Sequence, residues 1–334
     1  MRSRQAQPPW SGLRTFFGAE HSSIDQVAHG DIVVIGVPSD TTSGSRLGSK
    51  YGPEALRDSS MELRSYFDLA TEKTLYDIDA ERDTRLRFRS RLLDIGDAPV
   101  FPSDMRKTAE SVTAVVAAAT GAGALPVILG GDHYITFPCF RGFAEGCQAG
   151  SRSSSSLPLG YMQIDAHMDL NTDNAIFGPH FHGSNARLIM QLENVAPRNV
   201  VWVGLRGLCQ REHWDFIRTS GATAFTAKQV LRDGARQVAR RAAEIASHGT
   251  DGIYVSIDID VVDIAEAPGT GAIEFGGIAA LDLLAIVDEL STCEKIRAVD
   301  LMEVAPNLDP SGVTQRLGVA ALLGILRERL FEEY

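Results

Sequence analysis

The chain has 334 residues, of which 44% are hydrophobic, and its 43 acidic against 32 basic residues give a net charge of −11. This length and composition are typical of a globular protein with one large α/β domain or two small ones. The acidic balance argues against broad binding to nucleic acid or to an anionic membrane surface, and it fits a small cationic substrate as well as an ordinary solvated surface.

The sequence predicts alternating strands and helices behind an irregular arm at residues 1–30. Pro53 stands at the favoured first position of a helix. In chain order we expect strand 32–37, helix 53–66, strand 92–95, helix 105–120, strand 125–129, helix 135–143, strand 161–164, a long loop at 170–182, strand 200–203, helix 210–219, strand 222–225, helix 234–247, strand 253–257, helix 279–290, strand 296–299 and helix 313–332.

This alternation predicts a three-layer α/β/α fold, with helices on both faces of a mostly parallel sheet of roughly eight strands. We expect one catalytic domain over residues 31–334, with the serine-rich segment 151–156 as an exposed loop. The last helix carries an apolar face that either the sheet or a partner subunit could bury, formed by Val319, Leu322 and Leu326.

The sequence also indicates a cytoplasmic location. No apolar run approaches the roughly 18 residues of a membrane span. Residues 1–9 are polar, and no apolar signal-peptide core follows them. None of the four cysteines has C-x-x-C spacing, which favours reduced thiols in a reducing compartment.

Three blocks rich in carboxylates and histidines directly follow three of the predicted strands. They are Gly130-Gly131-Asp132-His133, Asp165-Ala166-His167-Met168-Asp169 and Asp258-Ile259-Asp260. Ligands gather at the carboxyl ends of parallel strands, so distant blocks can meet at one centre. Oxygen-rich ligand sets with one or two imidazoles suit ions such as Mn²⁺. Asp165 and Asp258 each begin an alternating pair, which places two ligands on one side of an extended backbone and suits a bridged two-metal hydrolase.

These blocks resemble those of the ureohydrolase family, which comprises arginases, agmatinases and guanidino-acid hydrolases. The resemblance extends over nearly the whole chain, with similar motifs at Gly36 to Asp40, Gly52 to Arg57, Asp94 to Asp97 and Pro268 to Gly271. It implies an arginase-like fold and a trimeric or hexameric homo-oligomer. A non-catalytic partner subunit of a hetero-oligomer with a paralogue is the alternative.

The resemblance also implies a role for each site residue. One ion would be bound by His133, Asp165, Asp169 and Asp258, and the second by His167, Asp165, Asp258 and Asp260. His182 would shuttle protons, and Glu303 would pair with the substrate guanidinium. We add His180 and Asn185 as candidate substrate contacts, and Asp263 as support for the ligands or their loop. The remaining histidines match no motif and are expected to be surface or packing residues: His21, His29, His213 and His248.

The implied reaction is attack of a metal-bridging hydroxide on a guanidino carbon, releasing urea and an amine. Two divalent ions per chain are expected, Mn²⁺ first and Ni²⁺ as the alternative. A two-metal hydrolase of amides or phosphate esters is disfavoured, because Glu303 would repel a phosphate. The substrate stays open among agmatine-like compounds, guanidine, alkylguanidines, guanidino acids and biguanides, because Met168, Ile264 and the segment 184–186 depart from the family pattern.

Overall fold

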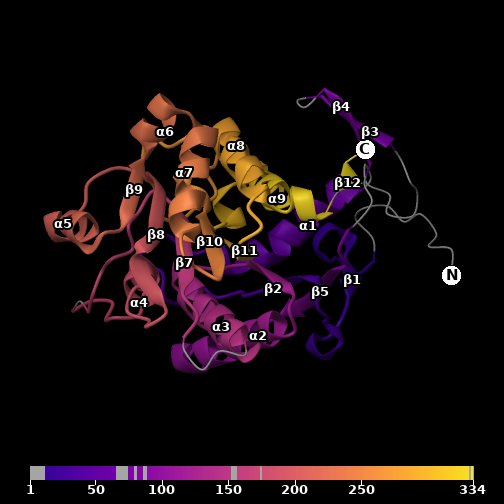
Figure 1. The fold of residues 1–334 in the computed structure, drawn as a ribbon, viewed down its shortest axis with the longest axis horizontal. Coiled ribbons are helices and arrows are strands. Elements are labelled where there is room, and N and C mark those ends of the chain that lie inside the picture. Colours follow the sequence, from indigo (N-terminus) through magenta and orange to yellow (C-terminus); the bar gives the residue numbers. More distant parts are fainter. Residues whose placement is uncertain are drawn as a thin grey trace.

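A nine-stranded sheet with helices on both faces forms the body of the computed structural model, which describes residues 12–64, 74–78, 81–85, 89–151, 156–173, 175–330 and 332–333 (Figure 1). The order of its strands is β1-β5-β2-β6-β11-β10-β7-β8-β9, and every neighbouring pair is parallel. The strands are β1 (Glu20–His21), β2 (Ile32–Gly36), β5 (Leu92–Asp97), β6 (Leu125–Leu129), β7 (Leu159–Ile164), β8 (Val195–Leu205), β9 (Thr223–Thr226), β10 (Gly252–Asp258) and β11 (Ile296–Met302). The predicted three-layer parallel fold is confirmed.

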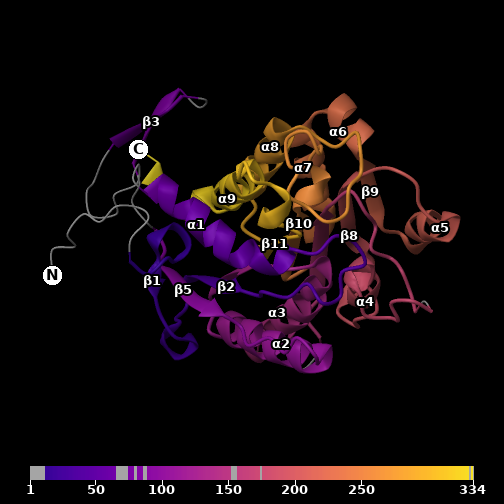
Figure 2. The same ribbon diagram turned by 180° about the vertical axis from the view of Figure 1, so that it is seen from behind.

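Two apolar cores lie on opposite faces of this sheet. Along β2, Ile32 and Val34 belong to one core while Val33 and Ile35 belong to the other, as the two-residue period of a strand requires. Figures 1 and 2 show α2 and α3 on one face, and α1, α7, α8 and α9 on the other. The helices are α1 (Gly52–Arg64), α2 (Met105–Gly121), α3 (Thr136–Ala149), α4 (Asn185–Ile189), α5 (Arg211–Ser220), α6 (Ala227–Asp233), α7 (Ala235–Ser247), α8 (Ala280–Ser291), α9 (Val313–Ile325) and α10 (Arg327–Leu330).

The described part of the expected arm, residues 12–30, packs against the body of the protein. Its strand β1 adds the ninth strand, and Phe16 and Phe17 are fully buried. The backbone N–H of Phe16 donates to Asp94, which is also paired with Arg57 at 2.9 Å. The motifs around Arg57 and Asp94 therefore hold the start of the chain onto the sheet.

Other differences from the predicted elements are local. The expected final helix is divided into α9 and α10, and its apolar face, which includes Val319 and Leu322, is buried inside this chain. That face therefore gives no support for a partner subunit. A small antiparallel sheet of β3 (Thr74–Asp77), β4 (Arg82–Arg85) and β12 (Glu332–Glu333) was not predicted. Residues 152–155 of the serine-rich segment lie outside the described residues. None of the described helices combines the length and apolar character that a membrane span requires.

Candidate metal centre

Four adjacent strands at the middle of the sheet bring the predicted site residues together. The order β6-β11-β10-β7 places the ends of these strands side by side, with Asp258 in register with Met302, and Ile257 with Ile164. Because all four strands are parallel, the residues that follow them meet at one edge. Gly131, after β6, approaches the neighbouring chain so closely that a Cβ atom would lie 1.8 Å from the carbonyl oxygen of Ser39. A glycine is therefore required at this position.

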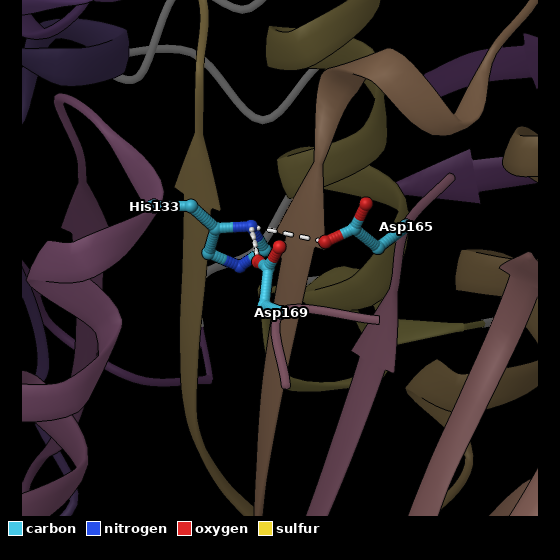
Figure 3. Close-up of side chains that lie close together, drawn as sticks. All are labelled: His133, Asp165 and Asp169. Atoms are coloured by element: carbon cyan, nitrogen blue, oxygen red, sulfur yellow. Dashed lines mark ion pairs between the residues drawn. The ribbon is translucent and has the colours of Figure 1, made fainter. Parts of the chain in front are cut away.

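The first ligand group surrounds the imidazole of His133 (Figure 3). Its Nδ1 atom lies 3.0 Å from Asp165 Oδ2, 3.1 Å from Asp169 Oδ2 and 3.0 Å from Asp258 Oδ2. This buried nitrogen nevertheless has no hydrogen-bond partner among the described residues. On the other side of the ring, Nε2 lies 2.9 Å from the hydroxyl of Ser256, an arrangement that leaves the Nδ1 lone pair directed at the three carboxylates.

A second ligand group shares Asp165 with the first. It joins Asp165, His167 and Asp260, with His167 Nδ1 lying 2.9 Å from Asp260 Oδ2 and 3.6 Å from Asp165 Oδ1. Asp165 thus presents one oxygen to each group, which is the geometry of a bridging carboxylate. Asp258 presents its Oδ2 to the first group, and its Oδ1 accepts the backbone N–H of Asp260 at 2.9 Å.

The donor set fits divalent metal ions. The site has four carboxylates and two imidazoles, and among the described residues the buried Nδ1 of His133 and the buried Oδ2 of Asp260 have no hydrogen-bond partner. Burying such groups unpaired is costly. A cation in each group would supply the missing partner. The main-chain angle φ of Asp169 is +49°, a strained value that non-glycine residues adopt mainly at functional sites.

The pKa shifts of the ligand residues, in the protein without metal, also indicate a cation site. Burial raises the pKa of Asp258 well above its usual range, and the charges of Asp260 and Asp165 raise it further. Burial opposes protonation of His133, yet its three carboxylate neighbours raise its pKa well above the ordinary value. The cluster therefore retains protons that a cation would displace.

Glu303 and His182 form a pair beside the two ligand groups. Glu303 Oε1 lies 3.2 Å from Nδ1 of His182 and accepts the backbone N–H of His133 at 3.0 Å. Its second oxygen, Oε2, is buried and has no hydrogen-bond partner among the described residues. The φ of Glu303 is +61°, a second strained backbone position at the site.

A layer of buried polar side chains holds the ligands from behind. Gln163 Nε2 donates to Asp165 at 2.6 Å and to Asp169 at 3.2 Å, and the hydroxyl of Tyr161 donates to Gln163 Oε1 at 2.8 Å. Behind His133, Ser256 contacts Thr136 at 3.2 Å, and Thr136 donates to Asp300 at 2.8 Å. The sequence motifs predict no role for these supporting residues. The sequence feature that could have identified them is a polar side chain inside an otherwise apolar strand, as at Gln163 and Ser256.

One cavity of about 380 Å³ is lined by Glu303 and by five of the ligand residues, His133, His167, Asp169, Asp258 and Asp260, together with residues from other elements. Arg206 and His213 are in its wall, so the expectation that His213 is a surface or packing residue is corrected. Arg206 donates to the carbonyl oxygens of Asp260 and Val261 at 2.5 and 2.8 Å, which fixes the loop after β10.

Three other candidates lie away from the wall of this cavity. Asn185 is fully buried and donates to Asp169 at 3.0 Å and to the carbonyl of His133, so it supports two ligand residues. His180 is exposed, and its contact is with Tyr134 at 3.4 Å. Asp263 accepts three backbone N–H groups of its own loop, at residues 265, 276 and 277, and so holds that loop.

Comparison with known proteins places this geometry in a family. The model of the Arginase family matches residues 30–326. Guanidinopropionase of Pseudomonas aeruginosa is 30% identical over 322 residues, which cover 96% of this chain and 92% of that protein. Mitochondrial agmatinase of Gallus gallus is 30% identical over 89% of this chain and 80% of its own length. The structure of proclavaminate amidino hydrolase from Streptomyces clavuligerus superimposes with a TM-score of 0.80 at 28% identity, covering 97% of this chain and 99% of that one. The chain is therefore a hydrolase of the Arginase family, the ureohydrolases that its motifs resemble.

Proposed function

We propose that the chain is a dinuclear metal hydrolase that cleaves a C–N bond of a guanidino compound and releases urea and an amine. One arrangement carries this proposal: Asp165 presents an oxygen to each of two ligand groups, and Glu303, whose Oε2 has no hydrogen-bond partner among the described residues, lines the cavity beside them. The relatives named guanidinopropionase and agmatinase support the same reaction class.

The side chains divide the chemistry between them. A guanidinium is planar and permanently charged, and Glu303 Oε2 can accept hydrogen bonds from it in the place of a missing partner. When bound, two divalent ions supply the nucleophile, because they lower the pKa of a water molecule towards neutrality. A C–O bond forms at the central carbon, the C–N bond to the substituent breaks, and the departing nitrogen takes a proton. His182, beside Glu303 in the cavity wall, is placed to deliver that proton.

We propose Mn²⁺ as the resident ion. Each ligand group combines a single imidazole nitrogen with carboxylate oxygens and contains no thiolate, a donor set that suits Mn²⁺. Nickel is the alternative, because imidazole also suits that ion. All four cysteines are free thiols, which supports a reducing compartment such as the cytoplasm.

We also propose that the chain forms a trimeric or hexameric homo-oligomer, as its family resemblance implies. Sedimentation of the purified protein at micromolar concentration tests this, and a monomer of 36.1 kDa would contradict it.

A urea-release assay tests the proposed reaction. The metal-free chain is loaded separately with Mn²⁺ and Ni²⁺ and incubated with guanidine, alkylguanidines, agmatine, guanidino acids and a biguanide. We expect urea in at least one case, and none with Asp165→Ala. A chain that binds two ions but releases no urea from any compound would overturn the proposal and favour the alternative of a non-catalytic partner subunit.

A further inference from the structure

Among the residues that the structure describes, the outer wall of the cavity has no free countercharge for a charged substrate tail. Beyond the ligand groups, Glu303 and the histidines, the described lining residues are Ser45, Ala166, Met168, Asn171, Phe181, Gly183, Arg206, Leu208, Cys209, Gln210 and Ala272. None of these carries a carboxylate. A cationic tail, such as the ammonium group of agmatine, would therefore enter the wall without an anionic partner.

Among the described lining residues named above, Arg206 carries the one permanent positive charge, and backbone carbonyl groups already bind its guanidinium. The guanidinium of Arg206 donates to four backbone carbonyl oxygens, those of residues 260, 261, 262 and 274, at 2.5 to 3.4 Å. Its Nε atom is buried and has no hydrogen-bond partner among the described residues. Arg206 thus holds the loop after β10 in place. An anionic substrate tail would have to compete with these hydrogen bonds for the guanidinium.

The remaining contacts in the wall are neutral, and several are apolar. Leu208 is fully exposed to solvent in this chain, and Met168, Phe181 and Ala272 add further apolar surface. His213 is half-buried, and burial together with the charge of Arg187 lowers its pKa, so it is neutral near pH 7. A carboxylate does lie near this region, that of Glu274, but it packs beside Gly207 and does not line the cavity.

We propose that the substrate is a guanidino compound whose substituent is uncharged and at least partly apolar, such as a short N-alkylguanidine. This inference rests on the proposed function, because it assumes that the guanidino group lies at Glu303. A volume of about 380 Å³ lies within the range of small-molecule pockets, about 300–1,000 Å³, so there is room for a substituent beyond the guanidino group. The outer wall, with Leu208 and Gln210 at its exposed part, then determines specificity.

Three substrates of similar length and different charge test the proposal. They are n-pentylguanidine, agmatine and 4-guanidinobutyrate, with guanidine as the compound that has no tail. For the metal-loaded protein we expect kcat/KM for n-pentylguanidine to exceed that of both charged compounds by about tenfold or more, because a charge gains no partner in the wall. Gln210→Asp should shift selectivity towards agmatine by about fivefold, and Gln210→Lys towards 4-guanidinobutyrate, with smaller shifts at high salt.

The matched control is Gln237→Asp, which adds the same charge on the exposed side of α7 and should leave the selectivity ratios unchanged. Preference of the unmodified chain for agmatine or 4-guanidinobutyrate would overturn the uncharged-tail inference while leaving the proposed function intact. Selectivity ratios that do not respond to either Gln210 substitution would also overturn it. Absence of urea from all four compounds, guanidine included, would instead count against the proposed function.

Discussion

Gln163 donates a hydrogen bond of 2.6 Å to Oδ2 of Asp165, the carboxylate that both ligand groups share. Both side chains are fully buried, and Tyr161 fixes the amide by donating to its oxygen at 2.8 Å. The amide proton therefore determines which way one oxygen of Asp165 faces. Residues that orient metal ligands in this way are typically worth about 10- to 100-fold in metal affinity.

We expect Gln163→Leu to weaken metal binding by about 10- to 100-fold, because Asp165 loses the donor that orients it. Tyr161→Phe should have a smaller effect in the same direction. Competition with a coloured chelator measures the affinity of the metal-free chain directly, without an activity assay. Gln237→Leu, on an exposed helix surface, is the control for the substitution itself. Unchanged affinity in a folded Gln163→Leu protein would show that the hydrogen bond has no positioning role.

Substitution of Asp165 should differ from substitution of Asp169 in metal stoichiometry. Asp165→Ala removes an oxygen from both groups, so we expect both ions to be lost. Asp169→Ala affects only the group around His133, so the ion beside His167 should remain. Metal analysis after desalting gives the number of ions per chain. Equal losses in the two variants would contradict the assignment of Asp165 as the shared ligand.

Metal binding should release protons. In the protein alone, burial and neighbouring carboxylates raise the pKa of Asp258, and the surrounding carboxylates raise that of His133 despite its burial. An ion binds the deprotonated forms, so affinity should fall as the pH is lowered and each ion should displace protons near pH 7. Calorimetric titrations in two buffers of different ionisation enthalpy would reveal this release. Identical heats in both buffers would be inconsistent with a protonated cluster.

The fold could be predicted from the sequence to the extent that strands were continuous apolar runs. Strands such as β2, β6 and β10 are buried on both faces, which produces that pattern, and their parallel arrangement follows from the helices between them. β1 was missed because its two residues, Glu20 and His21, are exposed and owe their pairing to β5. The place of Phe16 and Phe17 in the core likewise depends on a tertiary contact, that of Phe16 with Asp94.

The candidate site was predictable where each residue directly follows a strand. Asp165 and Asp258 meet because β7 and β10 are neighbours, and residues at the ends of adjacent parallel strands share an edge. Glu303, which follows β11, was predicted only through the family resemblance. Asn185 illustrates what spacing alone does not determine. It begins α4, and only the packing of that helix turns its amide inward to Asp169. The place of His213 in the cavity wall depends in the same way on tertiary packing, which brings α5 beside the loop after β7.

The last prediction separates the roles of Glu303 and His182. Glu303 Oε2 should hold the guanidinium in both the ground state and the transition state, so Glu303→Gln should raise KM and also lower kcat by misplacing the carbon. His182→Asn removes a proton donor, so kcat should fall by about 10²–10⁴-fold with little change in KM. Both variants should keep their metal content, because neither residue belongs to a ligand group.

The dependence of kcat on pH also tests the role of His182. Burial opposes protonation of His182, but the hydrogen bond and charge of Glu303 raise its pKa above the ordinary value. The imidazolium that can protonate the leaving amine is therefore present below this raised pKa, and it is lost as the pH rises through it. We expect kcat to decline on the alkaline side of this pKa, and the decline to disappear in His182→Asn. In Glu303→Gln the decline should move to lower pH, because the neutral amide opposes the effect of burial on the pKa of His182 less than the carboxylate does. A profile that keeps the same alkaline decline in His182→Asn would assign the proton donor to another group.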